Sequence, residues 1–285
     1  MPAVTLVRIM LPLVAGVACA WWIDRSTAVR RLLPPGFGSA TGEGLERRLA
    51  AMALLGLVLW IGIFAAFGQI GLPSVMDQID FESVSPLRLF QMHAILVAML
   101  AAWLMLGYWR CGHDAGTVIM TQLGLRTRTG QSIPSEVGIG LGAGVVLWAG
   151  VLAVVLLSAL IVGAAGGFEN LPNEAPPVVL WMGSLPVLVR LLLSLSAGVV
   201  EELFFRGFLM PRVGFGLSNV LFVLGHMSYE QPFMLLGVAL LSIAFSLLTL
   251  WRRNIWPAIA AHFLFDAIQL LVIIPTAAEA VGGAP

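Results

Sequence analysis

Long apolar runs separated by short polar segments extend along most of this 285-residue chain. A helix needs about 20 consecutive apolar residues to cross the hydrocarbon core of a bilayer, so the runs predict membrane-spanning helices. The predicted spans are Met1–Trp22, Leu49–Leu72, Arg88–Trp109, Val137–Gly167, Val178–Met210, Ser218–His226, Phe233–Leu250 and Ile255–Ile274. Pro211 is expected to end the fifth span, and Ser218 or Asn219 to cap the sixth. The pattern predicts an all-α, polytopic bundle of about eight transmembrane helices.

The connecting segments alternate in charge. Segments 24–48 and 110–136 carry arginines, whereas 73–87 and 168–177 carry acidic residues and no arginine. Positive charge marks the cytoplasmic side of a membrane protein. If both chain ends lie outside, twelve of the fifteen arginines fall on the inner side, and the exceptions are Arg8, Arg88 and Arg190. We therefore expect this orientation.

Composition supports the same class. The chain is 59% hydrophobic and 11% charged, with 15 basic and 15 acidic residues, whereas soluble domains carry about 25% charged residues. The zero net charge gives no indication of nucleic-acid binding. Cys19 and Cys111 lie far apart, which favours neither a disulfide framework nor a thiolate metal site. Every basic residue is arginine, as is typical of GC-rich bacterial genomes, and we predict a multi-pass protein of the bacterial inner membrane.

Charged and titratable side chains recur inside the apolar runs of the last third of the chain. A buried charge costs at least about 2.5 kcal/mol in the bilayer centre, so each such residue needs a reason. At about 1.5 Å of rise per residue, three separate helices bring a carboxylate and two imidazoles to similar depth from the inner edge. The six residues are Glu201, Glu202, Arg206, His226, His262 and Asp266. The sequence predicts that they form one site.

Spacing within each helix refines this prediction. Glu202 and Arg206 are four residues apart and are expected to form an ion pair. Glu201 points about 100° away from Glu202 and is left for a different partner. His262 and Asp266 also share a face, so the carboxylate is expected to orient or charge the imidazole. His93 has no acidic partner within its own span, and we interpret it as a structural or interfacial residue.

The six residues of the predicted site lie in three motifs, Glu201-Glu202-x-x-x-Arg206, Phe222-x-x-x-His226 and His262-x-x-x-Asp266. Together they resemble the CPBP (CAAX protease and bacteriocin-processing, or Abi) family of intramembrane glutamic endopeptidases. The resemblance covers roughly residues 180–270. It predicts a catalytic core at residues 178–275, preceded by an N-terminal transmembrane region at residues 1–177.

The resemblance implies peptide-bond hydrolysis near the cytosolic leaflet, without metal or other cofactor. Glu201 and His226 would activate water, and His262 with Asp266 would stabilise the oxyanion. Glu202 and Arg206 would support the site. Position 266 is often Asn in the family, and an ionised aspartate cannot donate a hydrogen bond. Asp266 is therefore either protonated, or it orients and charges His262.

Other functions stay open on the residues alone. His226, His262 and Glu201 or Asp266 would make an acceptable zinc set for a membrane protease, although the chain lacks an H-E-x-x-H motif. The two histidines could also ligate haem. A non-catalytic immunity or binding protein of the same fold would keep the helices without using the carboxylates. For an enzyme, the expected partners are the bilayer and a membrane-anchored or lipidated peptide substrate, whose identity nothing in the sequence determines.

Overall fold

The computed structural model describes residues 85–107, 114–167, 177–227 and 231–276, together with three isolated positions before them. Within those ranges every regular element is a helix and there is no strand. Four helices there are long and apolar enough to cross a membrane, over residues 87–105, 133–166, 232–252 and 256–276. The predicted class, an all-α integral membrane bundle, is confirmed. The first two predicted spans lie outside the described residues.

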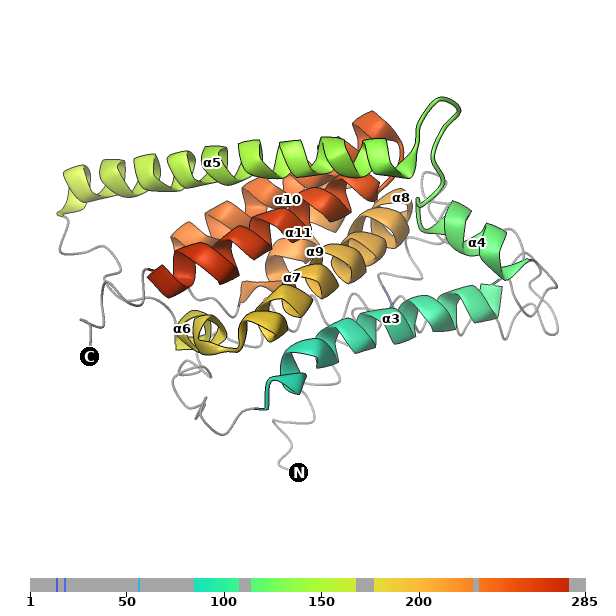
Figure 1. The fold of residues 1–285 in the computed structure, drawn as a ribbon, viewed down its shortest axis with the longest axis horizontal. Helices are drawn as coiled ribbons and strands as arrows, with labels where there is room; N and C mark the ends of the chain where they lie inside the picture. The colour runs from blue at the N-terminus through green and yellow to red at the C-terminus, as the bar shows by residue number, and fades with distance from the viewer. Residues whose placement is uncertain are drawn as a thin grey trace.

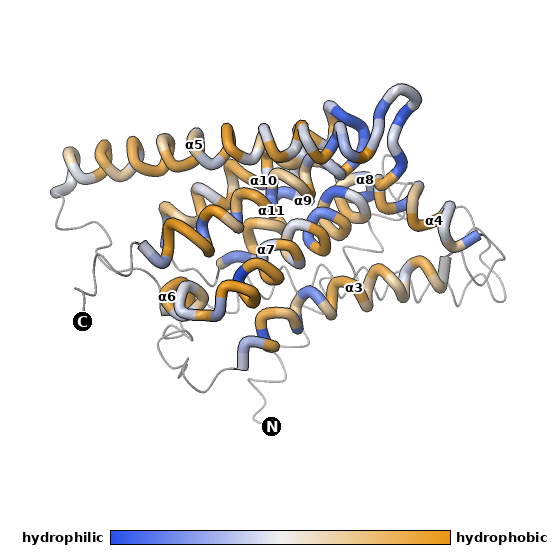
Figure 2. Tube along the Cα trace, viewed as in Figure 1, coloured by the Kyte–Doolittle hydropathy of each residue, from blue (hydrophilic) through white to orange (hydrophobic). Residues whose placement is uncertain are grey.

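The long helices lie roughly side by side in Figure 1, with α5 along one edge and α3 along the other. In chain order the elements are α3 (Leu87–Gly107), α4 (Ala115–Gln122), α5 (Ile133–Gly166), α6 (Pro177–Ser184), α7 (Val187–Glu202), the π-helix η6 (Leu203–Leu209), α8 (Met210–Val213), α9 (Phe215–Gly225), α10 (Pro232–Arg252), α11 (Trp256–Ile268) and the π-helix η8 (Gln269–Ile273). Hydrophobic positions run along most of these helices in Figure 2, and hydrophilic ones gather around the loop between α4 and α5.

Helix α11 is the centre of the bundle, with its most extensive packing against α5 on one side and α7 on the other. Small residues permit this close approach. A methyl group on Gly198 of α7 would lie 2.9 Å from the backbone nitrogen of Phe263, and one on Gly140 of α5 would lie 2.7 Å from the Ala260 side chain. The helix that carries His262 is thus held on both sides by backbone contact.

Two glycines of α5 give a matched test of this packing. We expect Gly140→Ala to lower the free energy of unfolding by about 1–3 kcal/mol, because the new methyl overpacks the contact with α11. Gly138 has nothing within 4 Å of the equivalent position. Gly138→Ala should be neutral or stabilising by up to about 1 kcal/mol, because alanine favours the helix. Unfolding of both variants in mixed micelles titrated with SDS measures the difference, and equal effects would contradict the proposed role of Gly140.

The fifth span was predicted as a single helix from Val178 to Met210, and this prediction is wrong. The chain breaks after α6, and α7 starts anew at Val187 behind Pro186, whose φ and ψ are −52° and 142°. A proline disfavours helical geometry in the residue before it and lacks the N–H that would continue the helix. The break separates the short α6 from the helix that carries the acidic pair.

Pro211 does not end the helical run, contrary to prediction. The π-helix η6 leads directly into α8, and Pro211 directly follows Met210, whose N–H donates to the Phe205 carbonyl at the end of the π-helix. The run ends at Gly214, whose φ of 88° only glycine adopts readily. Gly214 is also the N-cap of α9, four residues before Ser218, so Ser218 and Asn219 lie inside that helix.

Candidate active site

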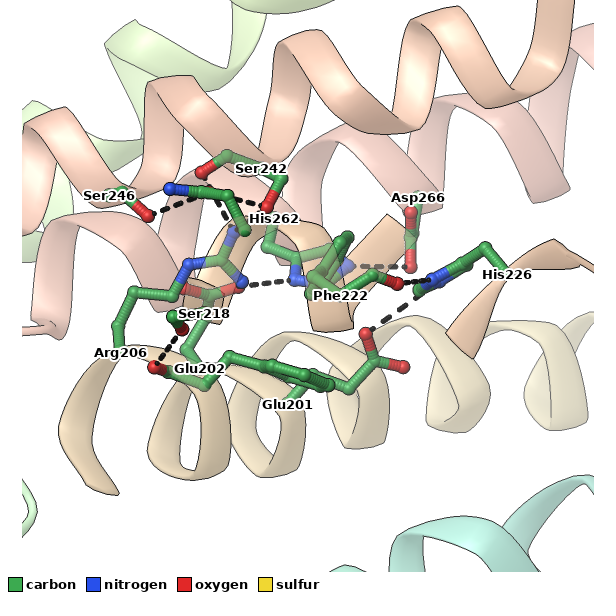
Figure 3. Close-up of polar contacts among 12 residues, drawn as sticks. Glu201, Glu202, Arg206, Ser218, Phe222, His226, Ser242, Ser246, His262 and Asp266 are labelled. Atoms are coloured by element: carbon green, nitrogen blue, oxygen red, sulfur yellow. Dashed lines mark hydrogen bonds and ion pairs between the residues drawn. The ribbon is translucent and has the colours of Figure 1, made fainter. Parts of the chain in front are cut away.

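The acidic pair lies at the junction between α7 and η6, where the helix widens from α to π geometry. Such π segments occur often at functional sites. Glu201 and Glu202 leave the helix in different directions in Figure 3, Glu201 toward His226 and Glu202 toward Arg206. The predicted divergence of the two carboxylates is confirmed.

Glu202 is fully buried and holds two partners through one oxygen. Its Oε1 accepts a hydrogen bond from Arg206 Nη1 at 2.9 Å and one from His262 Nδ1 at 2.8 Å. The predicted Glu202–Arg206 ion pair is confirmed. The bond to His262 was not predicted, and it joins the acidic motif to the last motif on α11. Breaking such a pair would leave an uncompensated charge in the core of the bundle.

Arg206 continues this network into α10 and α9. Its Nη2 donates to the backbone oxygen of Ser242 at 2.9 Å and to the Ser242 hydroxyl at 3.0 Å. The hydroxyls of Ser242 and Ser246 both donate to Asn219 Oδ1, at 2.6 and 3.0 Å. Nothing in the motifs indicated these three residues. Ser242 provides the guanidinium with two acceptors where water is excluded, and Asn219 in turn accepts from the Ser242 hydroxyl.

Glu201 faces His226 across a short gap. Glu201 Oε2 lies 3.9 Å from His226 Nε2, and both side chains are largely buried. His226 follows the last residue of α9 as its C-cap, rather than lying within a helix as predicted. The convergence of the carboxylate with this imidazole is confirmed.

The tautomer of a neutral His226 follows from its other nitrogen. Nδ1 lies 2.8 Å from the backbone oxygen of Phe222. A carbonyl only accepts, so Nδ1 must donate, and in the neutral imidazole Nε2 is then the acceptor. Glu201 Oε2 is buried and has no hydrogen-bond partner among the described residues. Two acceptor atoms therefore face each other at a distance that one water molecule can bridge.

Aromatic rings hold both imidazoles in position. The Phe222 ring stacks on His226 with centroids 4.6 Å apart and meets His262 edge-on at 6.1 Å. On the other side of His262, the fully buried Phe245 ring stacks at 4.9 Å. The Arg206 guanidinium lies 4.4 Å from the Phe222 centroid. Phe222 thus links all three motifs by packing.

Asp266 lies one helical turn beyond His262, with Oδ2 3.5 Å from His262 Nε2. Because Nδ1 donates to Glu202, a neutral His262 would present a lone pair to Asp266. The imidazolium form donates from both nitrogens, and the carboxylates of Glu202 and Asp266 on its two sides favour this charged form. The arrangement can thus supply a charged donor at Nε2.

His93 of α3 also reaches the site, and its interpretation as a structural or interfacial residue was incomplete. Its Nε2 lies 3.4 Å from Glu201 Oε1 and its Nδ1 lies 2.7 Å from the Ser196 hydroxyl. Arg190, for which no partner was predicted, donates to the backbone oxygen of Leu270 at 2.7 Å, away from these groups. A buried histidine in an apolar span was itself a signal that a polar partner lay on another helix.

The chain matches a known protein family over the segment that contains the three motifs. Residues 183–268 match the family model described as "Type II CAAX prenyl endopeptidase Rce1-like". The match confirms the resemblance over this segment, which contains Glu201, His226 and His262 and is similar to a family of endopeptidases. The matched residues lie within the predicted core at 178–275, and the division of the chain at residue 177 stays a prediction.

The chain is also similar to "Uncharacterized protein YpbD" of Bacillus subtilis (strain 168), with 30% identity over 77 residues. These residues make up 27% of this chain and 41% of the Bacillus protein. The chain therefore matches less than half the length of that relative. No solved structure matches the chain.

The zinc alternative gains no support from the geometry. In the part of the chain that the structure describes, no three His, Cys, Asp or Glu side chains are arranged to hold a metal ion. The two histidines belong to different partners: His226 faces Glu201, and His262 contacts Glu202 and Asp266. The arrangement instead offers a proton acceptor pair beside a charged donor.

Proposed function

We propose that this chain is an intramembrane endopeptidase that uses Glu201 and His226 to activate a water molecule. The observation that carries the proposal is the pair of facing acceptors, Glu201 Oε2 and His226 Nε2, 3.9 Å apart. A water between them would donate a hydrogen bond to each. General bases held in this way contribute about 10²–10⁴-fold to a reaction rate.

Hydrolysis would proceed by direct attack. The water oxygen forms a bond to the peptide carbonyl carbon while its proton passes to Glu201 or His226. The carbonyl oxygen becomes an oxyanion. When the C–N bond breaks, the leaving nitrogen takes up the proton held by the base, and the products are a carboxylic acid and an amine.

His262 would stabilise the oxyanion through Nε2–H. Its Nδ1 is engaged by Glu202, and its contact with Asp266 is long at 3.5 Å, so a nearer oxyanion could compete for the proton. Preorganised donors of this type are worth about 2.7–4 kcal/mol of barrier. Asp266 then acts by orienting and charging His262, the second of the two roles its sequence allowed. Glu202 and Arg206 hold His262 in place.

The proposed substrate is a membrane-anchored or lipidated protein, cut near the cytosolic leaflet of the bacterial inner membrane. The site lies among apolar helices, and three of the four long ones, α3, α10 and α11, carry residues that contact it: His93, Ser242 and His262. A lipid chain or transmembrane segment could bring a peptide bond there without leaving the bilayer.

Proteomics of membrane fractions tests the proposal directly. Cells that carry Glu201→Ala should accumulate an uncut precursor of at least one membrane-associated protein, while wild-type cells contain the cleaved form. Expression of the variant at wild-type level is the necessary control. Identical processing in both strains would contradict the enzyme and favour a non-catalytic binding protein of the same fold.

Substitutions at Asp266 separate its two possible roles. We expect Asp266→Asn to lower kcat by about tenfold or less, and Asp266→Leu by about 10- to 100-fold, since a hydrogen bond to a charged group is at stake. Asn keeps an oxygen acceptor for His262 but loses the charge, whereas Leu loses both. Cleavage of the precursor in detergent measures both values. A kcat of Asp266→Asn above that of the wild type would show instead that residue 266 donates directly to the oxyanion.

A further inference from the structure

We propose that His93 is a positioning residue for Glu201, and that the Ser196 hydroxyl supports the tautomer in which it acts. This inference rests on the proposed function and adds a residue from outside the segment that matches the family. His93 precedes that segment by ninety residues (93 against 183) and lies on α3. The site is incomplete without this helix.

Packing of α3 against α7 makes the contact possible. His93 is 8% exposed, although it lies in an apolar helix that is long enough to span the membrane. Both of its polar contacts are to α7, one to Ser196 and one to Glu201. Those two residues are five apart in sequence, so a single imidazole bridges more than one turn of α7.

Hydrogen-bond chemistry fixes the direction of the proton. An ionised carboxylate can only accept, so His93 Nε2 must carry the proton that it shares with Glu201 Oε1. In the neutral imidazole Nδ1 is then the acceptor, and the Ser196 hydroxyl at 2.7 Å donates to it. The chain of donors runs from Ser196 through His93 to Glu201.

The consequence for Glu201 is a fixed orientation. With Oε1 held by His93 at 3.4 Å, Oε2 is directed at His226. Loss of the donor would let the carboxylate rotate and would leave Oε1 buried without a partner. The water between Glu201 and His226 would then lose one of its two acceptors for part of the time. The effect falls on the chemical step rather than on substrate binding.

Kinetics with conservative replacements test this role. We expect His93→Leu to lower kcat about 10- to 100-fold with KM within about threefold of wild type, because a bond to a charged group is lost. His93→Gln should recover most of that loss, since its amide can donate from a similar position. Met92→Leu, at an exposed neighbour on α3, is the matched control. Wild-type kcat in His93→Leu, while Glu201→Ala is inactive, would overturn this inference alone.

A spectroscopic measurement makes the inference independent of any substrate. The chain has four histidines, so the imidazole ¹⁵N signals of the full-length protein in nanodiscs can be assigned by substitution. We expect His93 to be protonated at Nε2 in the wild type and its ring signals to shift in Glu201→Gln, where the acceptor for Nε2–H changes. In Ser196→Ala the proton should stay on Nε2 and the Nδ1 signal should shift, because the hydroxyl that donates to Nδ1 is lost. Met92→Leu should change nothing. Unchanged His93 signals in both Glu201→Gln and Ser196→Ala would overturn the inference, whatever the activity assay shows.

Discussion

Glu201→Gln should lower kcat for precursor cleavage by about 10²–10⁴-fold, the range for loss of a general base. The amide has nearly the same size as the carboxylate and fits the same space beside His226. The amide cannot take up a proton from water at neutral pH. Its NH₂ group is a donor, so it would face either the His93 N–H or the bridging water where the carboxylate offers an acceptor. The purified protein in detergent, assayed with the precursor found in cells, gives the rate.

Two controls make this result specific. Glu136→Gln changes the same chemical group at another fully buried glutamate. Glu136 pairs with Arg252 at 2.9 Å and lies well before the first motif in the sequence. It should lower stability without lowering kcat of the folded fraction. Wild-type activity should also survive dialysis against a chelator, in contrast to a zinc enzyme. Retention of more than half of kcat in Glu201→Gln would exclude the carboxylate as the base.

The long apolar helices could be predicted from the sequence because their signal is local. The predicted spans Arg88–Trp109, Val137–Gly167 and Phe233–Leu250 differ by only a few residues from α3, α5 and α10. Helix breaks were harder. Pro186 lies within an apolar run, so hydropathy alone does not mark the break before α7. Pro211 follows a π-helix that no local sequence pattern indicates, and the helical run therefore continues past it.

The core of the candidate site could also be predicted, since each motif combines titratable residues that a bilayer would otherwise exclude. The residues that were missed have a different character. Phe245, Ser242 and Asn219 are ordinary in an apolar or helical context, and only packing between helices gives them a role. His93 was noticed, but its partner is 108 residues away on another helix. Sequence spacing identifies partners within a helix and residues at matched depth on different helices, but it does not identify which atoms pair between helices.

The two adjacent glutamates have separate tasks because they face different helices. Glu201 keeps one oxygen toward His226 and the other toward His93. Glu202 is committed to Arg206 and His262 and is completely buried. A change at Glu201 should therefore alter the reaction, and a change at Glu202 should alter the fold of the site.

The second large effect is accordingly on stability. We expect Glu202→Gln and Arg206→Met each to lower the free energy of unfolding by about 3–5 kcal/mol, because each leaves the other charge buried without its partner. Arg206 is 1% exposed and Glu202 is 0% exposed, so water cannot replace the lost partner. Unfolding in mixed micelles titrated with SDS measures each value.

The double variant Glu202→Gln/Arg206→Met decides whether the pair acts as a unit. Its loss should be smaller than the sum of the single losses by about 1–3 kcal/mol, since removing both charges leaves neither unpaired. Glu202→Gln combined with Met92→Leu should be additive, because Met92 is exposed on α3 and makes no contact with the pair in the described structure. Additive losses for Glu202 and Arg206 would mean that the Ser242 contacts, rather than the carboxylate, hold the guanidinium in the bundle.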